Sequence, residues 1–439
     1  MTPPGPKGKL IVGSLPQLRD TPLESMTEWH DTYGDVVGLR VAGLNVFLLT
    51  HPDLVEEVLV TGNRNYIKPR LLRDTKELLG EGLLTSEGNF WLRQRRLSQP
   101  AFHRDRIAGY ASVMTSYTAR MLERWTPGEV RDIHHDMMEL TLEIVARTLF
   151  NTSVTEEARR VGDALEVALE RFVDRLSLTR YLDRLPLPKN IRFNRARRTL
   201  DTIIYGVIEE RRRSGEDTGD LLSMLLQAQD EDGSGMSDLQ LRDEVMTLFL
   251  AGHETTAIAL CWTLYLLSEN PDVDAALHDE LRSVLGGRIP TMDDIPALAL
   301  TGNIIRESMR LYPPAWRVGR EAIADCTLGG YHIPAGSQII MSQWLLHRDP
   351  RFWAEPERFD PGRWTDELEK SLPRFAYFPF GGGQRRCIGD TFAIMEATLI
   401  LATIAGRYRL EVVPEQKIAF WPSITLRPRH GMRMRVLER

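Results

Sequence analysis

This sequence contains few cysteines and has no excess of positive charge. Only three of the 439 residues are cysteine, and the formal net charge is −6. So few cysteines exclude a scaffold built on disulfide bonds and favour a reducing compartment such as the cytoplasm. The absence of a basic excess argues against a nucleic-acid partner.

Segments that would target or divide the chain are missing as well. The sequence begins with MTPPGPKG, which contains neither the apolar core of a signal peptide nor an anchor helix. We therefore expect a cytoplasmic protein without a membrane anchor, and an anchor removed ahead of residue 1 is the alternative. No linker rich in Pro, Gly or Ser and no internal repeat separates independent parts.

One cysteine, Cys387, lies in the most distinctive segment of the chain. Residues 380–389 read FGGGQRRCIG, and an apolar helical run from Phe392 to Ala405 follows. A helix N-terminus carries partial positive charge and unpaired N–H groups, which favour a thiolate and lower the cysteine pKa. A thiolate in this position is either a nucleophile or a metal ligand.

The neighbours of Cys387 favour a metal ligand. Three consecutive glycines would let the backbone approach a bulky flat group and leave amide N–H groups to donate to the sulfur. Phe380 would shield the sulfur from water, and Arg385 would meet a carboxylate of the bound group. Zinc is disfavoured because no second Cys or His lies nearby at ligand spacing. A nucleophile activated by a base from elsewhere in the chain, and a plain surface thiol, are the alternatives.

This pattern resembles the haem-binding loop of the cytochrome P450 family. The resemblance implies haem b (iron protoporphyrin IX) as the cofactor and Cys387 as the axial thiolate of its iron, which favours O–O cleavage. It also implies a single catalytic domain over residues 1–439, with a mainly α fold, small β-sheets (α+β) and a long central helix over the haem. The matching positions are Phe380, Gly383, Arg385, Cys387, Gly389 and, one helical turn later, Ala393.

Local patterns predict a mostly helical body with small sheets drawn from both ends of the chain. The helical body is expected at roughly 52–310 and 390–407. Strands are expected at 36–40 and 46–50, which flank a Gly/Asn turn and are predicted to form a hairpin. Further strands are expected at 331–333, 338–341, 408–413 and 423–426, which gives β-rich portions near 36–50, 331–342 and 408–439.

The longest predicted helix starts at Ser237, which forms a capping box with Gln240, and ends before Pro271. Its length alone would fit a membrane span, but residues 251–256 read AGHETT, and an ionisable Glu at the centre is costly in lipid. A buried core helix is therefore the prediction. The hydroxyl of Thr255 could bond back to the carbonyl four residues earlier and bend the helix, which would leave a groove for a small diatomic ligand.

The AGHETT stretch also resembles the oxygen-activation motif of the P450 family, Ala/Gly-Gly-x-Asp/Glu-Thr. The resemblance implies that Glu254 is the acid and Thr255 the alcohol of a pair that supplies the protons needed for O2 reduction. In this interpretation the carboxylate of Glu254 is linked to solvent. His253 and Thr256 are interpreted as packing residues.

Glu307 and Arg310 place opposite charges three residues apart on one helix face. Alone, such a pair is commonplace at a surface and contributes about 0.5 kcal/mol or less. With Arg358, they resemble the family's Glu-x-x-Arg helix and the arginine that joins it. The resemblance implies a buried structural triad that braces the cysteine loop, and loss of one member would cost roughly 3–5 kcal/mol.

Several arginines are candidates for contacts with the cofactor and with an electron donor. Trp91 and Arg95 match the family's Trp-x-x-x-Arg helix and, with Arg320 and Arg385, are implied to contact the haem propionates. A basic patch near Arg386 would dock an acidic donor, and an ordinary solvated face is the alternative. The chain shows no flavin or nucleotide domain, so a separate ferredoxin or flavodoxin with its reductase is expected. The patch would consist of Arg93, Arg95, Arg96, Arg104 and Arg106.

The resemblance as a whole implies a soluble, monomeric haem-thiolate monooxygenase that inserts one oxygen atom from O2 into a lipophilic small molecule. A peroxide-driven or rearranging relative and a non-catalytic haem sensor are the alternatives, and the Glu254–Thr255 pair argues against both. Fatty acids, terpenoids, steroids and macrolides stay open as substrates, and Lys68 or Arg70 would suit a fatty-acid carboxylate. By family position the pocket residues are Leu83, Leu84, Phe249, Ala251, Thr255, Ala315, Val318 and Ile424, each of which core packing would also explain.

Overall fold

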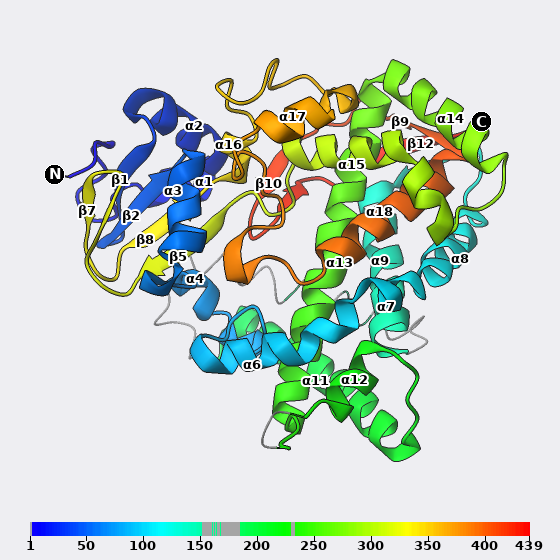
Figure 1. Cartoon of the computed structure of the whole chain (residues 1–439), viewed down its shortest axis with the longest axis horizontal. Helices are drawn as coiled ribbons and strands as arrows, with labels where there is room; N and C mark the ends of the chain where they lie inside the picture. The colour runs from blue at the N-terminus through cyan, green and yellow to red at the C-terminus, as the bar shows by residue number, and fades with distance from the viewer. Residues whose placement is uncertain are drawn as a thin grey trace.

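The computed structural model describes residues 2–151, 185–229 and 233–439, together with residues 160, 162, 164 and 167. Helices make up most of these residues, and small sheets join both ends of the chain, as predicted (Figure 1). The described helices are α1 (Leu15–Asp20), α2 (Pro22–Tyr33), α3 (Pro52–Glu56), α4 (Arg70–Arg73), α5 (Lys76–Leu79), α6 (Gly88–Ser98), α7 (Arg104–Ala108), α8 (Ala111–Leu122), α9 (Ile133–Phe150), α11 (Pro188–Ser214), α12 (Leu221–Gln227), α13 (Asp238–Glu269), α14 (Pro271–Leu285), α15 (Ala299–Leu311), α16 (Gln343–Leu346), α17 (Asp366–Ser371) and α18 (Asp390–Ala405).

The largest sheet lies beside the N-terminus, on the left of Figure 1, and has the strand order β1-β2-β8-β5-β3. The predicted hairpin is confirmed, since β1 and β2 are antiparallel, with Val36 opposite Leu49. Ala42 and Gly43 turn the chain between them with positive φ angles of 49° and 85°, as in a type I′ turn. The strands are β1 (Val36–Val41), β2 (Leu44–Leu49), β3 (Tyr66–Ile67), β5 (Val318–Ala322) and β8 (Gln338–Met341).

The C-terminal strands form separate small sheets. The predicted strand at 423–426 is wrong in its limits, because residues 423–425 form the turn between β10 and β11. The N–H of Ser423 donates to the carbonyls of Trp421 and Thr425, which closes this turn and leaves Ile424 exposed at its tip. The other strands are β4 (Val130–Asp132), β6 (Cys326–Leu328), β7 (Tyr331–Ile333), β9 (Tyr408–Val412), β10 (Phe420–Pro422), β11 (Leu426–Pro428) and β12 (Arg433–Glu438).

The central helix α13 runs through the middle of the molecule (Figure 1). The predicted capping box between Ser237 and Gln240 is confirmed, and Pro271 begins the next helix. Among the residues that the structure describes, α13 is the one helix long and apolar enough to cross a membrane. However, 83% of its apolar window is buried within the protein, as a helix that is apolar all round requires. The prediction of a core helix is therefore confirmed.

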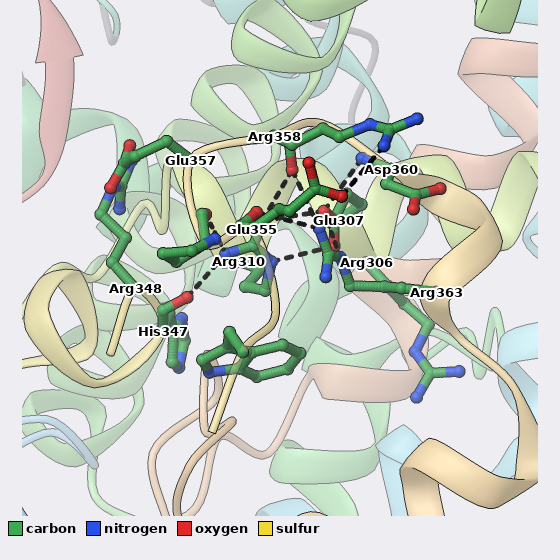
Figure 2. A network of polar contacts seen from close by, with 12 residues as sticks. Arg306, Glu307, Arg310, His347, Arg348, Glu355, Glu357, Arg358, Asp360 and Arg363 are labelled. Carbon is green, nitrogen blue, oxygen red and sulfur yellow. Dashed lines mark hydrogen bonds and ion pairs between the residues drawn. The ribbon is translucent and has the colours of Figure 1, made fainter. Parts of the chain in front are cut away.

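A second buried feature is the ion pair between Glu307 and Arg310 on α15. Both side chains are completely buried, and Arg310 donates from Nε and Nη2 to the two oxygens of Glu307 at 3.0 and 2.8 Å. The same guanidinium donates to the carbonyl oxygens of His347, Pro356 and Arg358 (Figure 2). One helix residue thus binds three backbone carbonyls from two segments, at residue 347 and at residues 356–358, in the region that leads to the cysteine loop.

Arg363, and not Arg358, is the second arginine of this network. The Nε of Arg363 donates to Oε1 of Glu307 at 2.9 Å, and the indole of Trp364 donates to Oε2 at 3.1 Å. The side chain of Arg358 is 62% exposed and pairs with Glu355 at the surface. The predicted triad is therefore wrong in its third member, because the short turn at Pro361–Arg363 brings Arg363 back onto α15 and leaves Arg358 only its carbonyl for the network.

We expect Arg363→Ala to lower the free energy of unfolding by roughly 3 kcal/mol, at the low end for a broken buried pair because Arg310 still compensates Glu307. The control Arg358→Ala removes an exposed pair and should cost about 1 kcal/mol or less. Urea unfolding followed by tryptophan fluorescence measures both. A loss in the control equal to that in Arg363→Ala would contradict the assignment.

Candidate active site

Cys387 lies in a tight loop immediately before α18, at the helix N-terminus that the sequence predicts. The N–H of Cys387 donates to the carbonyl of Phe380 at 3.0 Å, and the N–H of Arg386 donates to that of Gly383 at 3.2 Å. These bonds fold the loop back on itself. Cys387 is exposed, whereas the other two cysteines, Cys261 and Cys326, are buried and half-buried.

Two of the three glycines in this loop serve contacts with the protein itself. A Cβ at Gly383, whose φ is +63°, would collide with the carbonyl oxygen of Leu59 in the π-helical turn Glu57–Thr61. A Cβ at Gly382 would collide with the ring of Phe375. We expected all three glycines to admit a flat group, but only Gly381, with a φ of +67°, has open space beside it. Gly382 and Gly383 therefore let the loop dock on the fold.

The acidity of Cys387 differs from the expectation. Although the residue is exposed, desolvation by the protein around its thiol raises the pKa, and the N–H of Gly389 and the charges of Arg95 and Arg386 only partly oppose this. The prediction of a lowered pKa is wrong for the protein's own groups, because the helix N-terminus does not outweigh desolvation. A coordinated metal cation deprotonates such a thiol outright.

The residues predicted to meet the haem carboxylates gather near this loop. The guanidinium of Arg385 lies 3.5 Å from the ring centroid of Trp91 and forms an ion pair with Glu87. Arg95, one turn further along α6, donates from Nη1 to the carbonyl of Arg386 at 2.9 Å. The helix α6 thus presents Trp91 and Arg95 to the cysteine loop, and their contact with a haem propionate stays a prediction.

Arg320 adds a further cation to this group, and Lys68 is its neighbour. Burial and the charge of Arg385 lower the pKa of Arg320 to about 10 and that of Lys68 to about 7. Within the described residues Arg320 donates to the carbonyl of its neighbour Gly319 and has no carboxylate in contact. Because buried like charges are costly without anions, this cluster fits a ligand with two carboxylates, such as the propionates of a haem.

The ligand set fits an iron held by a porphyrin. Among the residues that the structure describes, no three His, Cys, Asp or Glu side chains come together to hold an ion. An iron bound here would take Cys387 as its one protein ligand among the described residues, and a porphyrin would supply the remaining ligands. The protein therefore provides a thiol, a cluster of cations for the ligand's carboxylates and an opening at Gly381.

The middle of α13 has one open face within an otherwise buried helix. Ala251 is exposed and Thr255 is half-buried. The predicted back-bond is confirmed, because Oγ1 of Thr255 donates to the carbonyl of Ala251 at 2.8 Å. Gly252 faces elsewhere, since a Cβ there would lie 3.0 Å from the side chain of Val145 on α9. Gly252 therefore serves the packing of α13 against α9.

Glu254 is locked into an ion pair that the sequence does not reveal. Its side chain is 4% exposed and accepts hydrogen bonds on Oε1 from Arg427 Nε at 2.7 Å and from the hydroxyl of Thr425. Both donors come from the β10–β11 hairpin, which the indole of Trp262 also holds through the carbonyl of Leu426 at 2.8 Å. The hairpin therefore engages Oε1 of Glu254, and the link from this carboxylate to solvent stays a prediction.

Other polar groups on α13 agree with packing roles. The Nδ1 of His253 lies 2.7 Å from the carbonyl of Phe249, and burial lowers the pKa of the imidazole. Thr256 lies next to Glu396 of α18, a completely buried carboxyl that the sequence did not single out. Burial raises the pKa of Glu396 to about 8, which the hydroxyl of Thr256 partly opposes.

The predicted pocket residues come from segments far apart in the sequence. Phe249 differs from the rest, because it is 4% exposed and stacks on Phe150 of α9 with ring centroids 4.4 Å apart. It belongs to the helical core, so its assignment to the pocket is not supported. Of the others, Leu83, Leu84, Thr255, Ala315 and Val318 are half-buried, and Ala251 and Ile424 are exposed.

The predicted basic patch is divided in the structure. Arg93 donates to Ser234 and Gly235 in the loop before α13, away from the cysteine loop. Arg95 holds Arg386, whose own guanidinium is 60% exposed and pairs with Asp390. Of the remaining members, Arg96 and Arg106 are exposed, and the side chain of Arg104 lies outside the described residues.

Comparisons with known proteins agree with this geometry. The family model for cytochrome P450 matches residues 3–431. The chain is 41% identical to cyclooctatin synthase of Streptomyces melanosporofaciens, over 96% of this chain and 92% of that protein. It is 40% identical to cyclooctat-9-en-7-ol 5-monooxygenase of the same organism, over 92% and 89%. It is 36% identical to pentalenene oxygenase of Streptomyces avermitilis, over 98% and 96%. The chain therefore belongs to the cytochrome P450 family and is a haem-thiolate monooxygenase that uses O2, a lipophilic substrate and electrons from a redox partner.

Proposed function

We propose that this monooxygenase oxidises a cyclic terpenoid. The observation that carries the proposal is the similarity, over nearly the whole chain, to relatives named for the oxidation of cyclooctat-9-en-7-ol and of pentalenene. The pocket residues support it, because Leu83, Val318 and Ile424 are apolar and partly accessible. A hydrocarbon skeleton gains affinity by burying such surface, at about 25 cal/mol per Å².

The structure gives less support to a fatty acid. The ammonium group of Lys68 donates to the carbonyls of Leu83 and Ser86 at 2.8 and 2.7 Å, so it is engaged within the fold. Arg70 is exposed at the start of α4. Neither cation is therefore a good anchor for a substrate carboxylate inside an apolar pocket.

The test is a titration of the haem-loaded enzyme with terpenoids, fatty acids, steroids and macrolides. The measured quantity is the shift in the spin state of the iron. We expect saturable shifts with cyclic terpenoids, and hydroxylated product when O2, NADPH and a redox partner are added. A saturable shift with another class and none with terpenoids would overturn the substrate assignment. It would leave the family assignment intact.

For the cofactor we propose haem b, ligated by Cys387. When bound, the haem supplies the activation of O2. Trp91, Arg95, Arg320 and Arg385 would hold its propionates, and the buried guanidinium of Arg320, which has no carboxylate in contact among the described residues, supports this. Phe380, Gly383 and Gly389 would shape the loop around the sulfur, which the tight turn and the docking of Gly383 on Leu59 support.

For proton supply we propose Thr255 as the group nearest the reacting oxygen, with Glu254 behind it. The hydroxyl of Thr255 donates to Ala251 and can still accept a bond from water on the open face of α13. Oε1 of Glu254 would have to exchange Arg427 for water before this oxygen could deliver a proton to that hydroxyl. Access of water is thus the step that these residues control.

We also propose a ferredoxin or flavodoxin as the electron donor, docked where Arg95 and Arg386 lie beside the cysteine loop. The exposure of Arg386 and the absence of a strong global charge support a local, electrostatically steered contact. We further propose that residues 1–439 form one catalytic domain and that the protein is a cytoplasmic monomer.

Replacing the axial ligand is the first prediction for this site. Cys387→Ala is expected to abolish the thiolate-type Soret band of the ferrous CO complex, because no other thiol lies in the loop. Cys326→Ser, which alters a free cysteine in β6, should leave the band unchanged. Persistence of the band in Cys387→Ala would refute the ligand assignment.

Thr255→Ala should retain haem but release more electrons as hydrogen peroxide. Product formed per NADPH should fall by about tenfold or more, because an acid–base group contributes on the order of 10²–10⁴ to a rate. The matched control is Thr263→Val, which removes a buried hydroxyl that donates to Ala259 at 2.7 Å on the same helix. Equal uncoupling in both variants would count against a specific role for Thr255.

Arg386→Glu should raise the KM for an acidic electron donor by about tenfold at low ionic strength, because it removes a steering charge at the docking surface. The difference from wild type should shrink as salt is added. Arg282→Glu on α14, where the side chain is 72% exposed, is the control for charge reversal elsewhere. A salt-independent effect, or the same effect in the control, would exclude this docking surface.

A further inference from the structure

Two buried side chains from distant parts of the chain hold the same peptide of one loop. The loop, residues 80–86, connects α5 to α6 and carries the pocket residues Leu83 and Leu84. The Nζ of Lys68 donates to the carbonyl of Leu83 at 2.8 Å, and Oε2 of Glu244 on α13 accepts from the N–H of Leu83 at 3.0 Å. Leu83 is thus held at both of its backbone groups. We call Lys68 and Glu244 the Leu83 clamp.

The rest of the loop is fixed to α13 through its backbone as well. The N–H of Glu81 donates to Oδ2 of Asp243 at 2.8 Å. A Cβ at Gly82 would collide with the hydroxyl of Thr247 and lie 2.6 Å from the carbonyl of Asp243, so only glycine permits this approach. The side chains of Leu83 and Leu84 take no part in these contacts. The loop is therefore attached through its backbone, and both side chains stay available to the proposed pocket.

The clamp buries two ionisable side chains, which costs free energy. Lys68 is 6% exposed and Glu244 completely buried, and burial raises the pKa of Glu244 to about 8. Arg385 and Arg320 face Lys68 and oppose its charge, while Asp243 faces Glu244 and opposes the charge of that carboxylate. Apolar side chains of similar volume would often stabilise a fold better than such buried ionisable groups. What they supply here is a fixed position for one peptide.

The clamp is also tied to the group that would hold the haem carboxylates. The N–H of Lys68 donates to Oε1 of Glu87 at 2.6 Å, and the other oxygen of Glu87 pairs with Arg385. Arg385 in turn stacks on Trp91. Leu83 is therefore linked to the proposed cofactor site through Lys68, Glu87 and Arg385. It is linked to the central helix α13 through Glu244.

We propose that Lys68 and Glu244 are positioning residues that set where Leu83 and Leu84 stand in the substrate pocket, and that they thereby set the size of the cyclic terpenoid accepted. The inference rests on the proposed function, because it takes Leu83 and Leu84 as pocket residues. The clamp acts through the backbone of the loop and touches neither the substrate nor the reacting atoms.

The test compares Lys68→Met and Glu244→Met with the conservative Glu244→Gln, whose amide oxygen can still accept from Leu83. Lys76→Met, which removes a half-buried lysine paired with Glu81, is the matched control. Hydrogen exchange of the haem-loaded proteins is measured on the peptide covering residues 80–87. We expect exchange at the Leu83 amide to rise by about tenfold or more in both Met variants and to stay near wild type in Glu244→Gln and in the control.

Spin-state titrations with a small and a large cyclic terpenoid give the second measurement. Both Met variants should lose affinity for the smaller ligand more than for the larger one, since a displaced loop widens the pocket. An equal loss for the two ligands, or unchanged exchange at Leu83, overturns the proposal. If Glu244→Met does not fold, Lys68→Met and Glu244→Gln still give opposite expected results.

Failure of the substrate proposal is a separate outcome. If wild type binds no terpenoid but another lipophile shifts the spin state, the terpenoid assignment fails. The clamp is then tested by hydrogen exchange and by spin-state titrations with a smaller and a larger member of that lipophile class. Altered exchange with unchanged size selectivity would mean that the clamp only stabilises the loop, which also overturns the positioning role.

Discussion

The burial of carboxylates along α13 is the constraint on which the rest of the site depends. Asp243, Glu244 and Glu254 are all at most 4% exposed, and a buried carboxylate without partners costs several kcal/mol. Asp243 pairs with Arg242 on the same helix, and all three carboxyl groups also accept hydrogen bonds from outside it: the backbone of loop 80–86 donates to the first two, and Arg427 donates to the third. One helix thereby fixes an N-terminal loop and a C-terminal hairpin. These two segments carry Leu83 and Ile424, so the same charges position two walls of the proposed pocket.

The same rule operates behind the cysteine loop. Glu307 accepts hydrogen bonds from Arg310, Arg363 and Trp364, and Arg310 also donates to backbone carbonyls. The charged groups therefore bind main chain and one another around the site and leave its open faces to apolar side chains. This arrangement explains how a chain with 26% charged residues can offer a lipophilic pocket.

Sequence patterns predicted the features that depend on neighbours in the chain. The capping box at Ser237, the β1–β2 hairpin and the back-bond of Thr255 are local, and all three are confirmed. Arg363 and Arg427 were missed, because each meets its acid only after the chain has folded back, and nothing beside them in the sequence marks the partner. The pKa of Cys387 was misjudged for a similar reason. The helix N-terminus is visible in the sequence, but the desolvation that outweighs it comes from packed segments.

The structure also separates two residues that the motif treats as a unit. Thr255 keeps its hydroxyl on the open face of α13, with only a back-bond to Ala251, whereas Oε1 of Glu254 is occupied by Arg427 and Thr425. Because Arg427 and Thr425 both donate to Oε1, its two lone-pair sites are taken and none is left for water. Any proton that passes through this oxygen therefore requires the β10–β11 hairpin to yield, and the tip of that hairpin is Ile424. One hairpin carries both the partners of the proposed acid and a residue of the proposed pocket, so in this proposal the position of the substrate and the supply of protons would depend on the same structural element.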